Sequence, residues 1–145
     1  MPGPQPRPLQ GNTFHVEIDG MTATAFSRVE IPTAELGVVS VRNGADPVPE
    51  PTNQPGSVSY GRLVLQRPLS GTTELWDWWA QARSGTDADR NVVVALLDRA
   101  RNPVWRWQFR NAFPVSYQSP VLDASGTDVV TESLALTFDS MDIET

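Results

Sequence analysis

The sequence predicts a mainly β fold of the α+β class, an antiparallel β-sandwich or barrel of about seven strands with one flanking α-helix. Two patterns carry this prediction. Most apolar residues alternate with polar ones in short segments that end at Gly, Pro, Asn-Gly or Asp-Gly. Only one segment, around residues 73–83, has the wider apolar spacing of a helix. With 145 residues, the chain has room for one domain with a hydrophobic core.

Proline divides the chain into a domain and two arms. Residues 1–12 hold four prolines and two glycines, which predicts a flexible N-terminal arm before a single domain at 13–145. Within that domain, residues 43–57 form a second Pro-rich arm between strands, with the sequence DPVPEPTNQPG at its centre. Because proline cannot donate to a strand ladder, we expect this arm to be an exposed loop outside the sheet.

Four strands are predicted before the helix. Asp19-Gly20 is a strong two-residue hairpin signal, since both central residues of a type I′ turn need positive φ. It predicts that the first strand pairs with the segment that follows it. In order, the predicted strands are Thr13–Ile18, Met21–Ile31, Glu35–Arg42 and Tyr60–Gln66.

The predicted helix spans about Thr73–Arg83, with Ser70 or Thr72 as its cap and Gly85 as its left-handed stop. Its polar residues form one narrow stripe, and the remaining arc is apolar and rich in tryptophan. The stripe consists of Glu74, Asp77 and Gln81, and the arc of Leu75, Trp76, Trp78, Trp79 and Ala82. The arc is wider than one core face requires, so we expect part of it to meet a partner.

Further strands are predicted after the helix. The run at Asn91–Asp98 is almost continuously apolar, as in a strand covered on both faces. Next, Trp105, Trp107 and Phe109 alternate with polar residues. The predicted strands here are Asn91–Asp98, Val104–Arg110, Phe113–Tyr117 and Thr131–Met141.

Composition excludes several classes of function. Eleven basic and seventeen acidic residues give a net charge of −6, which argues against nucleic acid as a partner. All eleven basic residues are arginine, so Schiff-base chemistry and a phosphate-loop lysine are excluded. Coding bias and subunit contacts are two alternative explanations of the arginines. Cysteine is absent, no apolar run approaches the roughly 18 residues of a membrane span, and the N-terminus lacks a secretory h-region.

No constellation of residues points to catalysis, to a cofactor or to a metal. His15, the only histidine, stands on the polar side of a strand beside Glu17. The D-x-D-x-N spacing of Asp87, Asp89 and Asn91 matches the opening of a calcium loop, with Asp98 at the twelfth position. Val92, however, occupies the position where that loop needs glycine. We therefore expect a protein that is not an enzyme and has no catalytic, cofactor or metal residues.

Four segments, in order, resemble the tail tube proteins of contractile phages and of phage-tail-like contractile injection systems. FHVEIDG…TAFSRVE is similar to the first hairpin of that family, and LVLQRPLSGTTELWDWW to its strand, arginine-leucine turn and E-L-W-D-W helix. VVVALLDRARNPVWRWQFRNAFPVSY resembles its W-x-F-x-N-A-x-P-x-x-Y segment, and SPVLDASGTDVVTESLALTFDSMD its closing stretch. The resemblance covers residues 14 to about 142.

The resemblance implies a small β-sandwich or barrel with one helix, related in structure to the type VI secretion tube protein. It also implies homo-hexameric rings that stack into an inner tube, assembled in a bacterial or archaeal cytoplasm. The implied partners are a sheath protein, baseplate and tube-initiator proteins, and a payload or spike, without membrane binding or sequence-specific nucleic-acid binding by this chain. Members of the family usually carry a basic arm where this chain has ADPVPEPTNQPG. This departure leaves a tube-initiator ring at the baseplate as an alternative, and a monomeric β-sandwich that binds ligands through exposed tryptophans is an alternative of another class.

Overall fold

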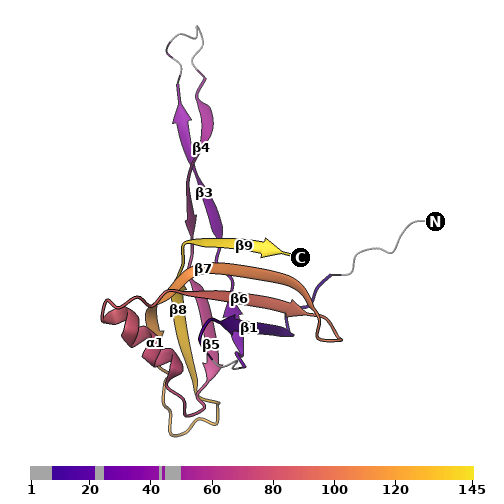
Figure 1. Ribbon diagram of the computed structural model, residues 1–145, viewed down its shortest axis with the longest axis vertical. Coiled ribbons are helices and arrows are strands. Elements are labelled where there is room, and N and C mark those ends of the chain that lie inside the picture. The colour runs from indigo at the N-terminus through magenta and orange to yellow at the C-terminus, as the bar shows by residue number, and fades with distance from the viewer. Residues whose placement is uncertain (1–7, 22–24, 43, 45–49) are drawn as a thin grey trace, which may run out of the picture.

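The computed structural model describes residues 8–21, 25–42, 44 and 50–145 (Figure 1). The described elements comprise nine strands and one helix. In chain order they are β1 (Phe14–Ile18), β2 (Arg28–Glu30), β3 (Ala34–Val41), β4 (Thr52–Tyr60), β5 (Leu63–Pro68), α1 (Glu74–Arg83), β6 (Arg90–Leu97), β7 (Pro103–Gln118), β8 (Thr131–Thr137) and β9 (Ser140–Glu144). The fold is mainly β with antiparallel pairing and one helix, as the sequence predicts.

The body consists of two antiparallel sheets that share the long strand β7. Sheet A has the order β1–β6–β7–β9, and sheet B the order β7–β8–β5–β2. β7 passes from one sheet to the other near Asn111, whose φ is +53°; asparagine tolerates this left-handed conformation better than most residues. The Asn111 side chain donates to Asp139 Oδ2 at 2.9 Å, and its backbone N–H donates to Asn91 Oδ1 at 3.2 Å, so neighbouring strands hold the bend.

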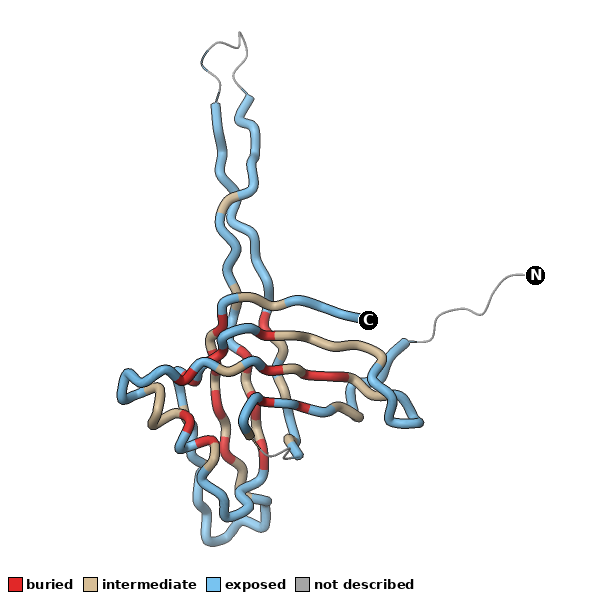
Figure 2. The backbone as a smooth tube through the Cα atoms, viewed as in Figure 1, coloured by how far each residue is buried: buried red, intermediate tan, exposed pale blue. Residues whose placement is uncertain are grey.

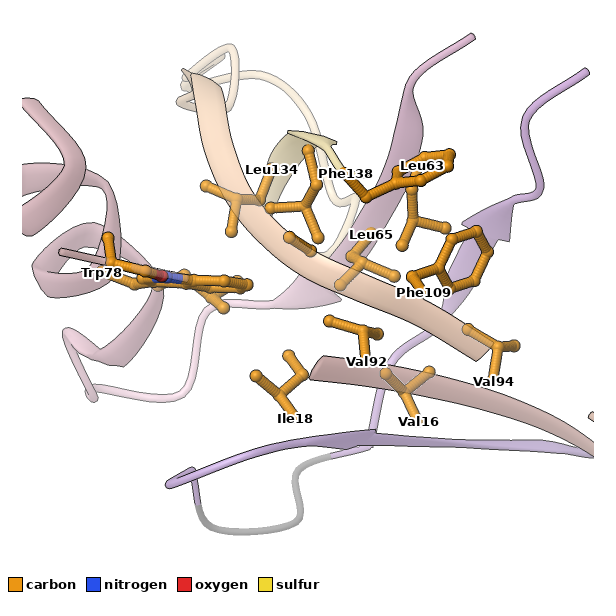
Figure 3. Packing of buried hydrophobic residues seen from close by; sticks show 14 residues of the cluster. Val16, Ile18, Leu63, Leu65, Trp78, Val92, Val94, Phe109, Leu134 and Phe138 are labelled. Atoms are coloured by element: carbon orange, nitrogen blue, oxygen red, sulfur yellow. The ribbon is translucent and has the colours of Figure 1, made fainter. Parts of the chain in front are cut away.

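The hydrophobic core lies between the two sheets, where one side-chain row of each strand points inward (Figure 3). Its central members are Val16 and Ile18 of β1, Val92 and Val94 of β6, Phe109 of β7, Leu63 and Leu65 of β5, and Leu134 and Leu136 of β8. Trp78 of α1 closes one end, and its indole N–H donates to the Ala88 carbonyl at 2.7 Å. The helix therefore flanks the body through Trp78 and Leu75.

β3 and β4 form a two-stranded ribbon that projects from the body (Figures 1 and 2). This corrects the prediction that prolines keep residues 43–57 out of strands, because Pro55 lies within β4 opposite Val38. The register shifts between Leu36 and Val38, and each ribbon strand has an unpaired outer edge. An edge strand at a bulge is where a residue without an N–H is tolerated. Residues 43 and 45–49 of the predicted arm lie outside the described part.

The predicted β1–β2 hairpin is wrong. The chain does turn at Asp19-Gly20, where Gly20 has φ +75° and the Met21 N–H donates to Ile18 O at 3.1 Å. β1, however, pairs with β6, and the following segment contributes only Arg28–Glu30, which pairs with β5. Pairing with β6 places Val16 beside Val94 in the core, so burial of apolar area decides the partner of β1. Residues 22–24 lie outside the described part.

The boundaries of several other strands differ from the prediction. The predicted strand Thr131–Met141 is two strands, which separate at Asp139 so that β9 can pair with β7. Conversely, the predicted Val104–Arg110 and Phe113–Tyr117 are one strand. β4 and β5 divide the predicted Tyr60–Gln66 strand near Gly61.

The helix begins within one residue of its prediction, but the cap is different. The N-cap residue is Thr73, whose hydroxyl donates to Asp77 at 2.9 Å and caps no backbone N–H, so neither Ser70 nor Thr72 has the predicted role. Gly85 has φ +77°, which confirms the left-handed stop.

Candidate assembly surfaces

Large apolar side chains exposed to solvent gather at two ends of the molecule. The described residues carry fourteen of them, and nine belong to two groups: five on the ribbon and four at or beside the loop of residues 119–130, hereafter the β7–β8 loop. The ribbon group is Leu36, Val38, Val39, Val41 and Val58; the loop group is Leu69, Val121, Leu122 and Val129. With the longest axis vertical, the ribbon lies at the top and the β7–β8 loop at the bottom (Figure 1).

The ribbon is shaped by a close approach of Gly37 and Gly56. A Cβ on Gly56 would lie 3.0 Å from the Gly37 carbonyl oxygen, and a Cβ on Gly37 would lie 3.2 Å from the Ser57 oxygen. Two glycines therefore let the strands cross tightly at the bulge. All eight residues of β3 are exposed, and Tyr60 at the end of β4 is the described ribbon residue that packs against the core, beside Phe138.

The β7–β8 loop borders a cleft of about 510 Å³ on the face of sheet B that points away from the core. Val64 and Gln66 of β5 form part of its floor, and Val121 and Val129 belong to its rim. Arg28 and Glu30 of β2 line one side and are joined by a 2.7 Å ion pair. The cleft therefore combines apolar side chains with groups that can hydrogen-bond a backbone.

The β7–β8 loop is held by a turn of its own. Asp123 Oδ1 accepts hydrogen bonds from the Ser125 backbone N–H at 3.0 Å and from its hydroxyl at 2.8 Å, and the Gly126 N–H donates to Asp123 O at 3.0 Å. The same hydrogen bonds lower the pKa of the Asp123 carboxyl below its ordinary value, because they stabilise the charged form. The turn follows directly after Val121 and Leu122, which are 91% and 80% exposed.

A buried polar network joins sheet B to the start of the helix. Arg67 and Glu132 are only 1% and 2% exposed, and Arg67 Nε donates to Glu132 Oε1 at 2.8 Å. Arg67 also donates to the Thr72 hydroxyl at 3.2 Å, and its Nη1 lies 3.9 Å from Glu74 Oε2. The Tyr117 hydroxyl donates to the second oxygen of Glu132. Burial, this hydrogen bond and the negative charge of Glu132 raise the pKa of Tyr117 to about 12.

No role was predicted for Arg67 or Glu132 from the sequence, although both fall within segments that carry the family resemblance, LVLQRPLSG and VVTESL. The alternation of side chains along each strand could have shown that both residues point inward. Each continues the inward row of its strand, Leu63–Leu65–Arg67 in β5 and Glu132–Leu134–Leu136 in β8. A charge in an inward row needs an opposite charge nearby. Their pairing across β5 and β8 supplies it.

The helix carries a second aromatic surface outside the core. Trp76 and Trp79 stack with ring centroids 5.2 Å apart, and the Arg83 guanidinium lies 4.9 Å from the Trp79 centroid. Trp76 is 40% exposed and also contacts the edge of Tyr117. The predicted wide apolar arc is therefore divided between the core, through Leu75 and Trp78, and this half-exposed stack.

Several sheet edges are unpaired among the described strands. In the body, β1, β9 and β2 each pair with one neighbour only, as do β3 and β4 in the ribbon. Exposed edges of this kind present backbone N–H and C=O groups to a neighbouring chain.

Among the described residues, the candidates for catalysis and for calcium binding do not come together in one site. His15 Nε2 lies 3.3 Å from Glu17 Oε1 in an exposed pair on β1. Strand β6 separates Asp87 and Asp89 from Asp98, so the calcium-loop spacing is spread along a strand. Within the described ranges, no group of three or more His, Cys, Asp or Glu residues has the arrangement of a metal site. The described part of the chain also contains no helix long and apolar enough to cross a bilayer.

Comparison with known proteins identifies the family. The profile of the T4-like virus tail tube protein gp19 family matches residues 10–142. A comparison with curated proteins found no match. Among solved structures, a chain in the 6-fold symmetrised cryo-EM structure of the anti-feeding prophage (AFP) baseplate is 25% identical, with a TM-score of 0.81 and 97% of each chain covered.

Two further structures share the fold. A chain in the PVC sheath–tube complex of an extracellular contractile injection system, in the extended state, has a TM-score of 0.84 at 23% identity, covering 94% of this chain and 91% of that one. Hcp1 from Flavobacterium johnsoniae has a TM-score of 0.58 at 15% identity, covering 90% and 94%. The family match spans nearly the whole sequence, so this chain belongs to the T4-like virus tail tube protein gp19 family.

Proposed function

We propose that this chain is a structural subunit of the inner tube of a contractile tail or injection system, where it forms six-membered rings that stack inside a sheath. Family membership supports the tube, and the likeness to a chain of a 6-fold symmetrised baseplate supports the sixfold ring. The likeness to a chain of a sheath–tube complex supports the sheath as partner. The chain then acts as the wall of a conduit for a payload.

The observation that carries the proposal is the ribbon. A two-stranded ribbon without a covering layer is marginally stable in water. Here, its eight-residue strand β3 is exposed throughout, and five large apolar side chains extend along both strands. Such a segment gains stability by burying these side chains against another copy of the chain. The unpaired edges of β1, β9 and β2 offer further contacts that could close a ring.

We favour the repeating part of the tube over an initiator ring at the baseplate. A repeating subunit needs a contact surface at each end of the molecule. The two groups of exposed apolar side chains lie at opposite ends of its longest axis. An initiator would meet copies of another protein on each side, so it would not need two ends that fit one another. The net charge of −6 would limit adhesion of an anionic payload to the wall.

Electron microscopy of the purified protein, alone and with its baseplate partner, tests the proposal. We expect rings of six copies and tubes of variable length built from such rings. Single rings that never elongate would indicate an initiator. A species with the mass of one chain under every condition would refute assembly and favour the monomeric ligand-binding module.

A further inference from the structure

The turn between β6 and β7, at Asp98–Asn102, presents two arginines to solvent. Arg99 and Arg101 are exposed, and no carboxylate of the described residues forms an ion pair with either of them. Hydrogen bonds within the turn hold its backbone: the Arg101 N–H donates to Asp98 O at 3.0 Å, and the Asn102 N–H donates to Asp98 Oδ1 at 2.8 Å. The two guanidinium groups therefore stand on an ordered backbone without a counter-charge among the described residues.

Arg101 occupies a position where the turn alone would favour glycine or asparagine. Its φ is +65°, in the left-handed region that residues with a Cβ seldom adopt. Among the described residues other than glycine, only Asn111 shares a positive φ. A strained backbone at an exposed charged residue indicates a role for its side chain.

The exposed face of α1 offers groups that suit an arginine. It is formed by residues at the i, i+3, i+4 and i+7 positions, namely Thr73, Trp76, Asp77 and Ala80. Asp77 Oδ2 accepts a hydrogen bond from the Thr73 hydroxyl, which leaves Oδ1 without a donor among the described residues. Trp76 is 40% exposed beside it. A guanidinium can bond such a carboxylate and stack on such an indole at the same time.

The turn and the helix face lie on opposite sides of the body. In the view of Figure 1, α1 is at the left and the turn that follows β6 is at the right, so the turn cannot reach the helix of its own chain. We propose that the β6–β7 turn of one copy docks on the exposed face of α1 of a neighbouring copy, with Arg101 bound between Asp77 and Trp76. This inference rests on the proposed tube function and adds a contact that does not involve the ribbon. Because unlike surfaces meet, the contact repeats from copy to copy, and it closes on itself when the copies form a ring.

The charges of the two surfaces favour this pairing over others. Asp98 lies at the start of the turn, and the Arg83 guanidinium lies 5.7 Å from the Trp76 centroid on the helix. The turn thus carries a carboxylate beside its arginines, and the helix carries an arginine beside its carboxylate. Contact between two turns would instead bring arginines together, which is unfavourable. A carboxylate of a sheath protein or of a payload could also bind the arginines, and the test separates these cases.

Exchange of charges between copies tests the contact directly. Arg101→Asp places two carboxylates opposite each other in the contact, and Asp77→Arg places two guanidinium groups there. Under conditions that give wild-type rings or tubes, each variant alone should give roughly tenfold less assembled protein in sedimentation and electron microscopy. An equimolar mixture of the two variants should assemble again, because alternating copies meet only unlike charges. A ring with an even number of copies permits this alternation, and a chain that carries both substitutions should assemble as well.

Both variants should fold as single chains. Aspartate tolerates a left-handed φ better than most residues, so Arg101→Asp keeps the turn. Asp77→Arg loses an exposed hydrogen bond and a favourable charge near the helix N-terminus. We expect the melting temperature of each unassembled variant to stay within about 5 °C of the wild type. Recovery of assembly in the mixture would show in addition that both chains are folded.

The matched control combines Asp77→Arg with Arg62→Asp, at an exposed arginine between β4 and β5, in one chain. It has the net charge of the wild type without the exchanged contact, so it should assemble as poorly as Asp77→Arg alone. Normal assembly of either single variant, or equal recovery in the control, would overturn the inference. Failure of both variants and of their mixture would also overturn it, and would assign the two surfaces to another protein. In each case assembly of the wild type shows that the proposed function stands, and a wild type that forms no ring or tube would refute that function instead.

Discussion

Arg67 and Glu132 lie inside the body, where a charge without a partner is costly. Their direct hydrogen bond satisfies one oxygen of Glu132, and the Tyr117 hydroxyl satisfies the other. Arg67 meanwhile reaches the Thr72 hydroxyl, in the turn before the helix. The network therefore fixes where α1 starts relative to sheet B. Its contribution is positional, since a buried ion pair adds little net stability compared with apolar residues of the same shape.

We predict that Glu132→Ala lowers the free energy of unfolding by about 3 kcal/mol, the lower end of the cost of breaking a buried ion pair, because it removes the hydrogen-bonded counter-charge of Arg67 and leaves only Glu74, 3.9 Å away. Urea unfolding followed by tryptophan fluorescence measures the loss. The control is Glu17→Ala, which removes an exposed partner of His15 and should change stability by no more than about 0.5 kcal/mol. Equal effects of the two substitutions would show that the buried network is not coupled to the fold.

Ionisation of Tyr117 makes the stability of the fold depend on pH in the alkaline range. Its pKa is about 12 in the folded chain, against about 10 in an unfolded one. Below pH 10 the phenol is protonated in both states. As pH rises from 10 to 12, the unfolded state releases the proton first and gains stability relative to the folded state. We therefore predict that wild-type stability falls more steeply over this range than that of Tyr117→Phe.

Thermal unfolding at several pH values between 8 and about 11.5 would measure the two slopes. Tyr117→Phe loses the hydrogen bond to Glu132 at every pH, so the absolute stabilities of the two proteins differ and only the slopes are compared. Parallel curves for wild type and variant would contradict the prediction.

At the scale of single elements, the ribbon depends on its two glycines. A Cβ at position 56 would lie within 3.0–3.2 Å of the Gly37 carbonyl and the Val39 side chain, so Gly56→Ala forces the backbone of β3 to shift. We predict faster amide exchange in β3 and β4 and fewer or shorter tubes. The free energy of unfolding of the body should change by less than about 0.5 kcal/mol, since the described ribbon residue that packs against the core is Tyr60, at the end of β4.

Gly44→Ala is the matched control. It lies between β3 and β4, and an added Cβ would meet no atom of the described residues within 4 Å. This variant should therefore exchange and assemble like the wild type. If Gly56→Ala also behaved like the wild type, the tight crossing of the strands would have no role in assembly.

Some features of the helices and strands could be predicted from the sequence alone, and others could not. The helix and the inward rows of β1, β5 and β8 follow from local periodicity, because each apolar pattern matches the spacing of its own element. Strand partners do not follow in the same way. The Asp19-Gly20 turn forms, yet β1 pairs with β6, with Val16 opposite Val94 from a distant part of the sequence, because that partner buries its apolar row.

The two strands of the ribbon were not fully predicted from the sequence, for a related reason. Proline content predicts where a strand is disfavoured inside a sheet, but both ribbon strands are edges and Pro55 lies beside a bulge. The cleft was not predicted either, since Arg28, Val64, Gln118 and Val129 come from four separate segments. Only the packing of sheet B brings these residues together.

Across the whole molecule, the body contains the hydrophobic core, and the two ends carry exposed apolar side chains. The core residues all come from β1, β5–β8, α1 and the segments that join them, and the ribbon contributes no buried side chain. If the copies assemble as proposed, folding of the body and assembly therefore depend on different residues. A change in the ribbon should alter assembly while leaving the fold of the single chain intact.

We predict that removal of residues 38–55, which joins Gly37 directly to Gly56, leaves a folded chain that cannot form long tubes. The pairs Ala34–Tyr60, Glu35–Ser59 and Leu36–Val58 remain, and the Gly-Gly junction suits a short hairpin loop. Circular dichroism and thermal unfolding should match the wild type, and electron microscopy should show no long tubes. A full-length variant with Val38, Val39 and Val41 each replaced by threonine keeps the ribbon's length and its β-branched residues. Its tubes should also be few, because the apolar contact is lost; normal tubes from either variant would mean that other surfaces hold the copies together.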